Sequence, residues 1–399
     1  MQPVAAPLCP PGLAANRPAL LMLGLVLVAL NLRPALSSVS PVLAQVQQAL
    51  GLSATAAGLL TTLPVLCLGV FAPLAPRLAQ RLDAERAVFA VLFVLAAGTA
   101  LRGAFGSVGL FAGALLAGAS IGVIGVLLPG IVKREFAGQA GAVMGLYTMS
   151  LSLGAALAAG ATVPLSRVFD GDWRPALALW ALPALLGAAA WWPQLRQRTR
   201  QAPAAPASGL WRSPLAWAVT LYMGLQSSLA YCVFGWLPTI LIERGISALQ
   251  AGFVLSLAVL LQLVTAFSGP WLATRIGRDQ RPVLWLMLGT ALAGLLGCLW
   301  APLGSLWLWA ALLGLGQGGQ FSVALLLVVL RAPNPQRAAQ LSGMAQGVGY
   351  TLAAFGPLAV GLLHDATGGW GAVGVLFMAF TVAAAAAGGW AGQHKQVPA

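Results

Sequence analysis

The stretch "GLSATAAG" at residues 51–58 returns as "GISALQAG" at residues 245–252. At the same offset of 194 positions, "PRLAQRLDAE" at 76–85 falls on "PWLATRIGRD" at 270–279. Each copy runs from a helix start through apolar residues into a basic turn. The repeat therefore predicts a chain made of two halves built on one plan.

The composition places most of the chain in a membrane. Of 399 residues, 59% are hydrophobic and only 7% are charged, which leaves too little polar surface for a soluble domain. About 20 apolar residues cross a bilayer core, and twelve stretches are long enough. The second and eighth begin at Ser53 and Ser247, which can cap a helix N-terminus. The twelve stretches lie near 18–42, 53–77, 85–105, 107–131, 139–163, 175–193, 213–241, 248–273, 282–300, 304–330, 340–362 and 370–391.

The two copies of the repeat have the same polarity, so the sequence predicts an all-α polytopic membrane protein whose six-helix halves are related by a parallel pseudo-two-fold axis. We expect an N-terminal bundle over residues 1–193, a cytoplasmic linker over 194–212 and a C-terminal bundle over 213–399. The linker is basic and then rich in proline and alanine. Two such bundles can rock against each other, which is the alternating-access mechanism.

The distribution of charge predicts the orientation. The chain has 21 Lys and Arg against 8 Asp and Glu, and 16 of the basic residues fall on the side of the N-terminus, against four on the other side. Basic residues are retained in the cytoplasm. We therefore expect an inner-membrane protein with both termini cytoplasmic, whose positive charge reflects topology and not nucleic-acid binding.

Signatures of soluble chemistry are missing from the sequence. The four cysteines are scattered without paired spacing, and there is no Walker loop, no nucleophile elbow and no His/Cys cluster. We expect no enzyme activity, no cofactor and no metal. The expected partners are a small-molecule substrate, the lipid bilayer and protons as a candidate coupling ion, and the expected state is a monomer.

Arg33, in "NLRPAL" at 31–36, lies in the middle of the first apolar stretch. An arginine at this depth costs about 2.5–3.5 kcal/mol, so it should face the bundle interior with a partner. All eight acidic residues fall in loops or at span ends. Pro34 leaves the carbonyl of Leu30 without its helical donor, which favours a structural role, whereas the planar guanidinium suits an anion. Both interpretations stay open.

The chain resembles the major facilitator superfamily in the loop after the second span. "PRLAQRLDAER" and "PWLATRIGRD" are similar to its G-x-x-x-D-R-x-G-R signature, and Arg81 and Arg275 match the signature arginine. The resemblance implies that these arginines act in gating. Gln80 and Thr274 replace the signature aspartate, so another contact must hold the inner gate.

More specifically, the chain resembles the bacterial branch of cyanate and nitroimidazole transporters over nearly its whole length. The stretches that carry this likeness are "NLRPALSSVSP" (31–41), "LLPGIVKREF" (127–136), "GLYTMSLSLGAALAAG" (145–160), "GLQSSLAYCVFGWLPTILIERG" (224–245), "GLGQGGQF" (314–321) and "LSGMAQGVGYTLAAFGPLAVGLLHDATGGW" (341–370).

The superfamily lines its cavity with the first, fourth, seventh and tenth spans, flanked by the fifth and eleventh. Polar residues at these places become candidate substrate ligands together with Arg33. Buried amides and phenols also join helices, at around 0.6 kcal/mol per hydrogen bond, and that alternative stays open for each. Asn31 points away from Arg33 along the helix and is a packing or gating candidate. The substrate candidates are Ser37, Tyr147, Gln226, Ser227, Tyr231, Gln317, Gln320, Gln346 and Tyr350.

These observations predict a secondary transporter of a small, polar, anionic solute. One alternative is an exporter of nitroimidazole-like or amphipathic drugs, and another, of a different class, is a non-transporting membrane sensor. The candidates for a proton relay are His364, at the outer end of the eleventh span, and Glu135, at the inner end of the fourth. Facilitated diffusion, anion exchange and proton coupling all fit the sequence.

Overall fold

The computed structural model describes residues 17–52, 54–196 and 208–398, and this part of the chain is helical with no strand. Short 3-10 turns cover Ser40–Val42, Ala137–Gln139, Trp192–Arg196 and Leu303–Ser305. The helices are α2 (Arg17–Leu32), α3 (Pro34–Ser37), α4 (Leu43–Leu50), α5 (Ala54–Phe71), α6 (Leu74–Leu82), α7 (Ala84–Leu101), α8 (Gly106–Glu135), α9 (Ala140–Val168), α10 (Trp173–Leu179), α11 (Ala181–Trp191), α12 (Ser208–Trp211), α13 (Pro214–Glu243), α14 (Ala248–Arg275), α15 (Arg281–Trp300), α16 (Leu306–Arg331), α17 (Pro335–Thr367) and α18 (Gly371–Ala391).

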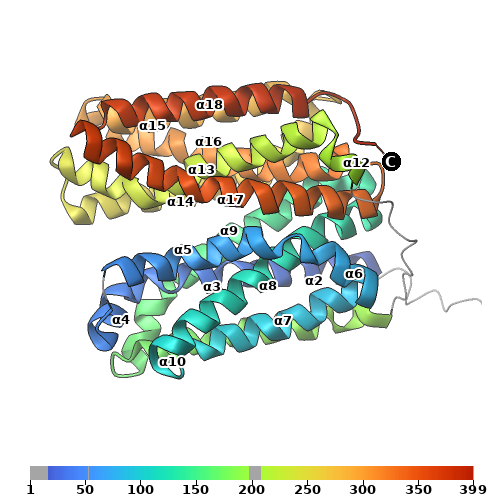
Figure 1. Cartoon of the computed structure of the whole chain (residues 1–399), viewed down its shortest axis with the longest axis horizontal. Helices are drawn as coiled ribbons and strands as arrows, with labels where there is room; N and C mark the ends of the chain where they lie inside the picture. The colour runs from blue at the N-terminus through green and yellow to red at the C-terminus, as the bar shows by residue number, and fades with distance from the viewer. Residues whose placement is uncertain (1–16, 53, 197–207, 399) are drawn as a thin grey trace, which may run out of the picture.

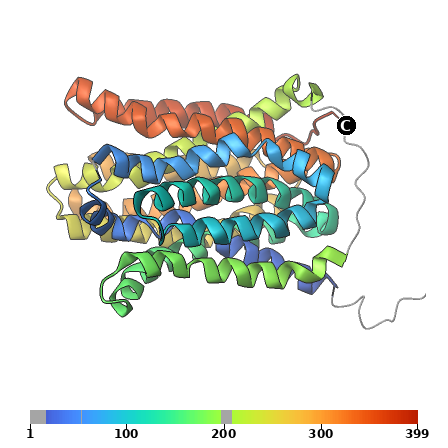
Figure 2. The ribbon, with the colours of Figure 1, turned by 60° about the horizontal axis from the view of Figure 1, so that its bottom comes forward.

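The helices form two layers, with α2 to α11 in one and α13 to α18 in the other (Figure 1). Among the described residues, eleven helices are long and apolar enough to cross a membrane, and the bent pair formed by α5 and α6 raises the number to twelve. This confirms the predicted fold class. We call the end where α6, α12 and residues 392–398 lie the linker end (right in Figure 1); the turned view shows the same long helices running toward it (Figure 2).

The first predicted span, 18–42, is broken in the structure. Helix α2 ends at Leu32, Arg33 lies in a turn, and the chain restarts as the short helix α3 at Pro34. Proline has no N–H to donate to the preceding turn and its ring collides with the carbonyl four residues earlier, so the helix cannot run through this point unchanged. The break places Arg33 between two helical segments.

The two copies of the repeat differ in shape. In the first copy, the helix bends by 57° between Thr62–Phe71 and Leu74–Leu82, whereas α14 in the second copy continues to Arg275 with Pro270 inside it. One proline is common to both copies, but Pro73 has Phe267 as its counterpart. Pro73 lies in the break between the two helical segments, and it explains the bend.

The predicted start of the second copy is confirmed, because the Ser247 hydroxyl accepts a hydrogen bond from the Gln250 amide at 3.3 Å. Its counterpart Ser53 lies outside the described residues, as do 197–207 of the predicted linker. The exact boundary between the halves stays a prediction.

Close backbone packing joins the halves near the linker end. Helix α9 of the first half lies on α14 of the second, and a Cβ at Gly141 or Gly145 would clash with Thr274 or with the Phe267 carbonyl. One turn further, the Thr148 hydroxyl donates to the Ala266 carbonyl at 2.8 Å. Such close approach requires glycine, so these glycines carry one side of the contact between the halves.

Helix α17 makes the second contact. The Gln346 amide donates to the Gly125 carbonyl on α8 at 2.9 Å, and a Cβ at Gly347 would lie 3.3 Å from the Gly69 carbonyl on α5. Arg81 and Arg275 are exposed at the linker end, and the guanidinium of Arg275 lies 5.1 Å from the Trp271 ring on its own helix. In this arrangement backbone packing and two hydrogen bonds hold the linker end closed.

Replacing Gly145 by valine should force the halves apart at the linker end, because the added methyl groups would overlap the Phe267 carbonyl. Overpacking of this kind costs about 1–3 kcal/mol, which should reduce the closed population by roughly tenfold. The measurement is the rate at which a maleimide labels an Ala339→Cys variant, because that position faces Gly130 across the interface. The assay uses purified protein whose native cysteines are replaced.

The matched control is Gly160→Val on the same helix, where nothing lies within 4 Å of an added Cβ. Only Gly145→Val should accelerate labelling. Equal labelling rates in both variants and the parent would contradict the interface described for α9 and α14.

Candidate functional site

Arg33 lies where the two halves meet, half-buried at the break between α2 and α3. Its side chain reaches into the C-terminal half, where its charge acts on the hydroxyl group of Tyr231 on α13. Its guanidinium carbon lies 5.3 Å from the centre of the Phe321 ring on α16, within the range of a cation–π contact. One residue of the first half is thus in contact with two helices of the second.

Two further tyrosines complete the surroundings. Tyr147 on α9 and Tyr350 on α17 are each 3% exposed, and both lie close enough to interact electrostatically with Arg33. Tyr350 also interacts with Tyr231 and Tyr147. We call Tyr147, Tyr231 and Tyr350 the tyrosine cluster. It gathers neutral hydroxyl groups from both halves around one guanidinium.

No carboxylate pairs with Arg33 within the described residues. The ion pairs found there join other basic groups to acids at the ends of helices or in turns. A charge removed from water without a counter-charge is costly, and phenol hydroxyls can only partly compensate it. The site therefore carries an uncompensated positive charge at the centre of the bundle, which favours an anion.

The alternative role for Arg33 is to bind the backbone carbonyl that Pro34 leaves without a donor. Gly154 of α9 packs so closely on the Leu30 carbonyl that an added Cβ would overlap it. The carbonyl of Arg33 accepts from the amides of Leu36 at 2.9 Å and Ser37 at 3.1 Å, and from the Ser37 hydroxyl at 3.1 Å. The Arg33 carbonyl therefore has hydrogen-bond partners within its own segment, while Gly154 shields the Leu30 carbonyl.

Arg102 holds the end of α3, a role that the sequence analysis did not identify. Its Nη1 donates to the Ala35 carbonyl at 2.6 Å and to the Ser38 hydroxyl at 3.4 Å, and the side chain is 1% exposed. Gly113 makes room for it, since a Cβ there would lie 2.6 Å from Arg102 Cγ. A second arginine thus fixes the segment that follows Arg33. Its position near the end of the apolar stretch 85–105 was the available signal.

The predicted amide ligands bond mainly to backbone or to one another. Gln226 donates to the Met223 carbonyl at 3.0 Å and to the Ser227 hydroxyl at 2.7 Å. Gln320 donates to the Met287 carbonyl at 3.1 Å. The Gln226 bonds stay within α13, and the Gln320 bond joins α16 to α15, as the interhelical alternative for it requires. The remaining contacts are Gln317 accepting from Gln262 at 3.1 Å and Gln346 donating to Gly125 and to Ser342.

The relay candidates lie near opposite ends of the bundle, away from the tyrosine cluster. His364 Nε2 is 3.3 Å from a Glu243 carboxylate oxygen that also accepts from Trp370 Nε1 at 2.8 Å. Glu135 accepts from the neighbouring Arg134 at 2.6 Å. Neither group is within the Arg33 site in this arrangement.

Asn31 faces its own half. Its side-chain amide donates to the Leu27 carbonyl at 2.6 Å, and a Cβ at Gly187 on α11 would lie 3.1 Å from the same nitrogen. The side chain is 6% exposed. Its position in this arrangement is that of a packing residue between α2 and α11.

Three relatives match most of the chain. An uncharacterized transporter of Bacillus subtilis (strain 168) is 41% identical over 380 residues, which is 94% of each protein. The 2-nitroimidazole transporter of Escherichia coli (strain K12) is 37% identical and covers 91% of this chain and 92% of its own. The cyanate transport protein of the same organism is 36% identical, over 88% of this chain and 91% of its own.

The fold has solved counterparts as well. The proton:xylose symporter of the major facilitator superfamily, bound to 6-bromo-6-deoxy-D-glucose, aligns with a TM-score of 0.77 at 13% identity, over 95% of this chain and 97% of that one. At this identity the likeness concerns the fold alone. The sequence model of the Major Facilitator Superfamily matches residues 21–350 and 245–394. With two similar halves, a multi-pass helical bundle and relatives of this identity, the chain belongs to the Major Facilitator Superfamily of transporters.

Proposed function

We propose that this protein is a secondary transporter of a small, planar anion that binds Arg33 between the two halves. The observation that carries the proposal is an arginine at the centre of a membrane-spanning bundle with no acidic partner among the described residues. An incoming anion would supply the missing counter-charge. The cyanate transport protein among the relatives is consistent with an anionic cargo.

The geometry favours a flat cargo. A guanidinium offers two parallel N–H donors, which match the two oxygens of a carboxylate or nitro group. Phe321 lies on one side of this guanidinium, and the Tyr231 hydroxyl lies within range of its charge. The hydroxyl groups of Tyr147 and Tyr350 can donate to further acceptors of the cargo. The site would thus bind one charged group and a short planar body.

Alternating access follows from the division of the site between the halves. Arg33 and Tyr147 belong to the first half, and Tyr231, Phe321 and Tyr350 to the second. A bound anion would be shared by both halves, and rocking would break the backbone contacts at the linker end while the site is retained. That interface is packed through glycines, so opening it would not require ion pairs between these residues to be separated.

A second candidate is export of nitroimidazole-like compounds. Its support is the aromatic lining of Tyr147, Tyr231, Phe321 and Tyr350, together with the relative that transports 2-nitroimidazole. A nitro group presents two oxygens with partial negative charge and would take the same guanidinium fork. The two candidates differ in the net charge of the cargo.

We also propose the orientation and surroundings of the transporter. The linker end carries most of the basic residues, so it would face the cytoplasm of a bacterial cell with both termini on that side. The predicted halves, 1–193 and 213–399, would act as the moving bodies, as a monomer. If protons are coupled to transport through His364 or Glu135, these residues would bind the proton near the ends of the bundle and away from Arg33.

The proposal is tested by uptake of labelled cyanate, benzoate and 2-nitroimidazole into proteoliposomes. Arg33→Gln should lower kcat/KM for the anionic cargo by about 30-fold or more, because loss of a charged hydrogen-bond partner costs about 2–5 kcal/mol. Arg33→Lys keeps the charge but loses the fork, so it should retain only part of the activity. Unchanged anion uptake by Arg33→Gln would refute the proposal, and saturable transport of 2-nitroimidazole alone would favour the second candidate.

Tyr231→Phe should raise the KM for the anion by roughly three- to tenfold, because one neutral hydrogen bond contributes about 1 kcal/mol. The matched control is Tyr222→Phe on the same helix, whose hydroxyl bonds the Gln320 carbonyl at 3.4 Å and is remote from Arg33. The control should leave KM within about twofold. Equal effects of the two substitutions would show that Tyr231 acts through packing only.

A further inference from the structure

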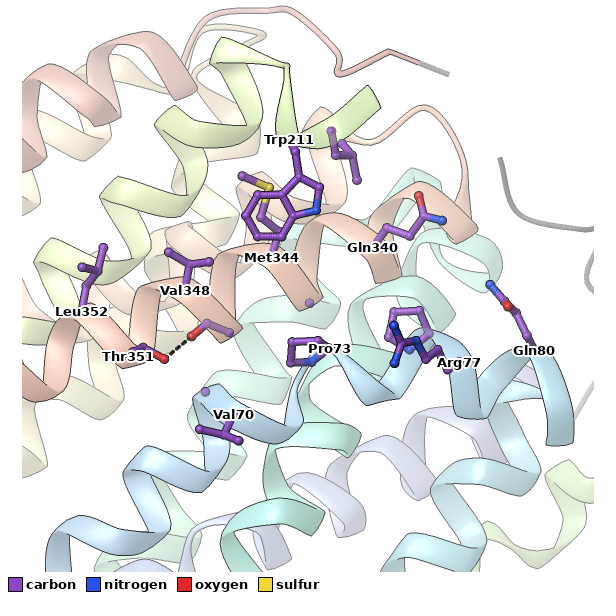
Figure 3. Close-up of a pocket in the computed structure, with 15 residues that line it drawn as sticks. Val70, Pro73, Arg77, Gln80, Trp211, Gln340, Met344, Val348, Thr351 and Leu352 are labelled. Carbon is purple, nitrogen blue, oxygen red and sulfur yellow. Dashed lines mark hydrogen bonds between the residues drawn. The ribbon is translucent and has the colours of Figure 1, made fainter. Parts of the chain in front are cut away.

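A groove opens between the two halves at the linker end, on the flank of α17 away from Arg33. It measures about 700 Å³ and is lined by α5, α6, α12 and α17 (Figure 3). The backbone of Gly69 and Gly347 forms part of its floor. Leu352, which lines the groove, follows Tyr350 by two residues, about 200° around the helix. Helix α17 therefore separates the groove from the tyrosine cluster.

The bend of the first repeat copy creates this groove. Because the chain turns by 57° before α6, α6 lies less tightly on α17: a Cβ at Gly343 would be in ordinary contact with Pro76, at 3.7 Å, without a clash. In the pseudo-equivalent pair, the straight α14 packs directly on α9, where an added Cβ at Gly145 would clash with Phe267. Pro73 thus gives one flank of the molecule a groove where the other is packed closed.

The chemistry of the groove changes along its length. Near the linker end it is lined by the exposed side chains of Arg77 and Gln80 on α6, with Gln340 across from them on α17 (Figure 3). Further along, the walls are apolar, with Val70 65% and Leu352 45% exposed. None of the residues that line the groove is acidic. The lining therefore combines one cationic, hydrogen-bonding end with an apolar trough.

The cationic end of the groove is expected to lie at the level of the lipid headgroups. Trp211, half exposed on the short helix α12, lies at the same end of the groove (Figure 3). Tryptophan concentrates at the level of lipid headgroups, and an arginine there can extend its charged head toward phosphates while its stem lies on apolar surface. The apolar trough then continues toward the membrane centre, parallel to lipid acyl chains.

We propose that this groove binds an anionic phospholipid of the linker-side leaflet. Its phosphate would accept the N–H groups of Arg77 and the amide of Gln80, and one acyl chain would lie along Val70, Val348 and Leu352. A headgroup bearing an amine would find no carboxylate among the lining residues, which favours a headgroup with net negative charge such as phosphatidylglycerol. The site is independent of the cargo proposed for Arg33.

The lipid would act on the conformational equilibrium. The groove has walls from both halves, α5 and α6 from the first and α17 from the second, with α12 of the predicted linker beside them. A ligand that contacts both walls binds the present arrangement more tightly than one in which the halves have separated, and so shifts the population toward it. Anionic lipid therefore stabilises the arrangement that is closed at the linker end.

The test is native mass spectrometry of the full chain in mild detergent, titrated with phosphatidylglycerol, with phosphatidylcholine and with inorganic phosphate. The variants are Arg77→Gln, which removes the charge, and Val348→Trp, which fills the trough. The matched control is Arg278→Gln, an exposed arginine that follows α14 in the second half and does not line the groove. Melting temperatures of all four proteins establish that each is folded.

We expect phosphatidylglycerol to bind the parent and Arg278→Gln at least fivefold more tightly than either groove variant, and more tightly than phosphatidylcholine binds the parent. Equal binding to the parent and to folded Arg77→Gln and Val348→Trp would overturn the proposal. So would equal binding of both lipids, or a competing effect of inorganic phosphate alone, which would identify a site for the free ion.

Discussion

A half-buried guanidinium with no carboxylate partner among the described residues is the constraint on which the rest of the structure depends. Arg33 must be held in the bundle interior, yet its charge must stay available. The chain meets both conditions by giving other partners to the backbone around it. Gly154 covers the carbonyl that Pro34 leaves without a donor, and Arg102 binds the end of α3. The guanidinium is then surrounded by neutral phenols and one phenyl ring, where a small anion gains the most from electrostatic attraction.

The two halves contact each other through different groups at the Arg33 site and at the linker end. At Arg33 the halves meet through polar side chains, whereas toward the linker end they meet through glycines and two hydrogen bonds to carbonyl groups, from Thr148 and Gln346. Backbone packing of small residues is close but contains no ion pair, so it can be separated without desolvating charges. The repeat makes the two flanks similar, and Pro73 makes them different. That single proline bends one helix and leaves the groove in which we place a lipid.

Sequence reasoning reached the fold because hydropathy, the repeat and the basic residues all constrain the same architecture. It also listed Arg33 and the three tyrosines of the cluster together, because the resemblance to the superfamily placed them all on spans that line its cavity. It could not assign the partners of the glutamines, because an amide on a span has the same pattern whether it binds cargo or the next helix. The role of Arg102 and the bend at Pro73 depend on distances between segments far apart in the chain, which spacing does not encode.

The central claim is that Arg33 recognises negative charge, and the most direct measurement compares benzoate with its neutral isostere benzamide in a thermal-shift titration of purified protein. A ligand that binds the folded state raises the melting temperature with its concentration. Benzoate should stabilise the parent protein and benzamide should not, and Arg33→Gln should lose this difference while melting normally without ligand. Equal stabilisation by both compounds, or a benzoate effect that survives in Arg33→Gln, would contradict an anion site at Arg33.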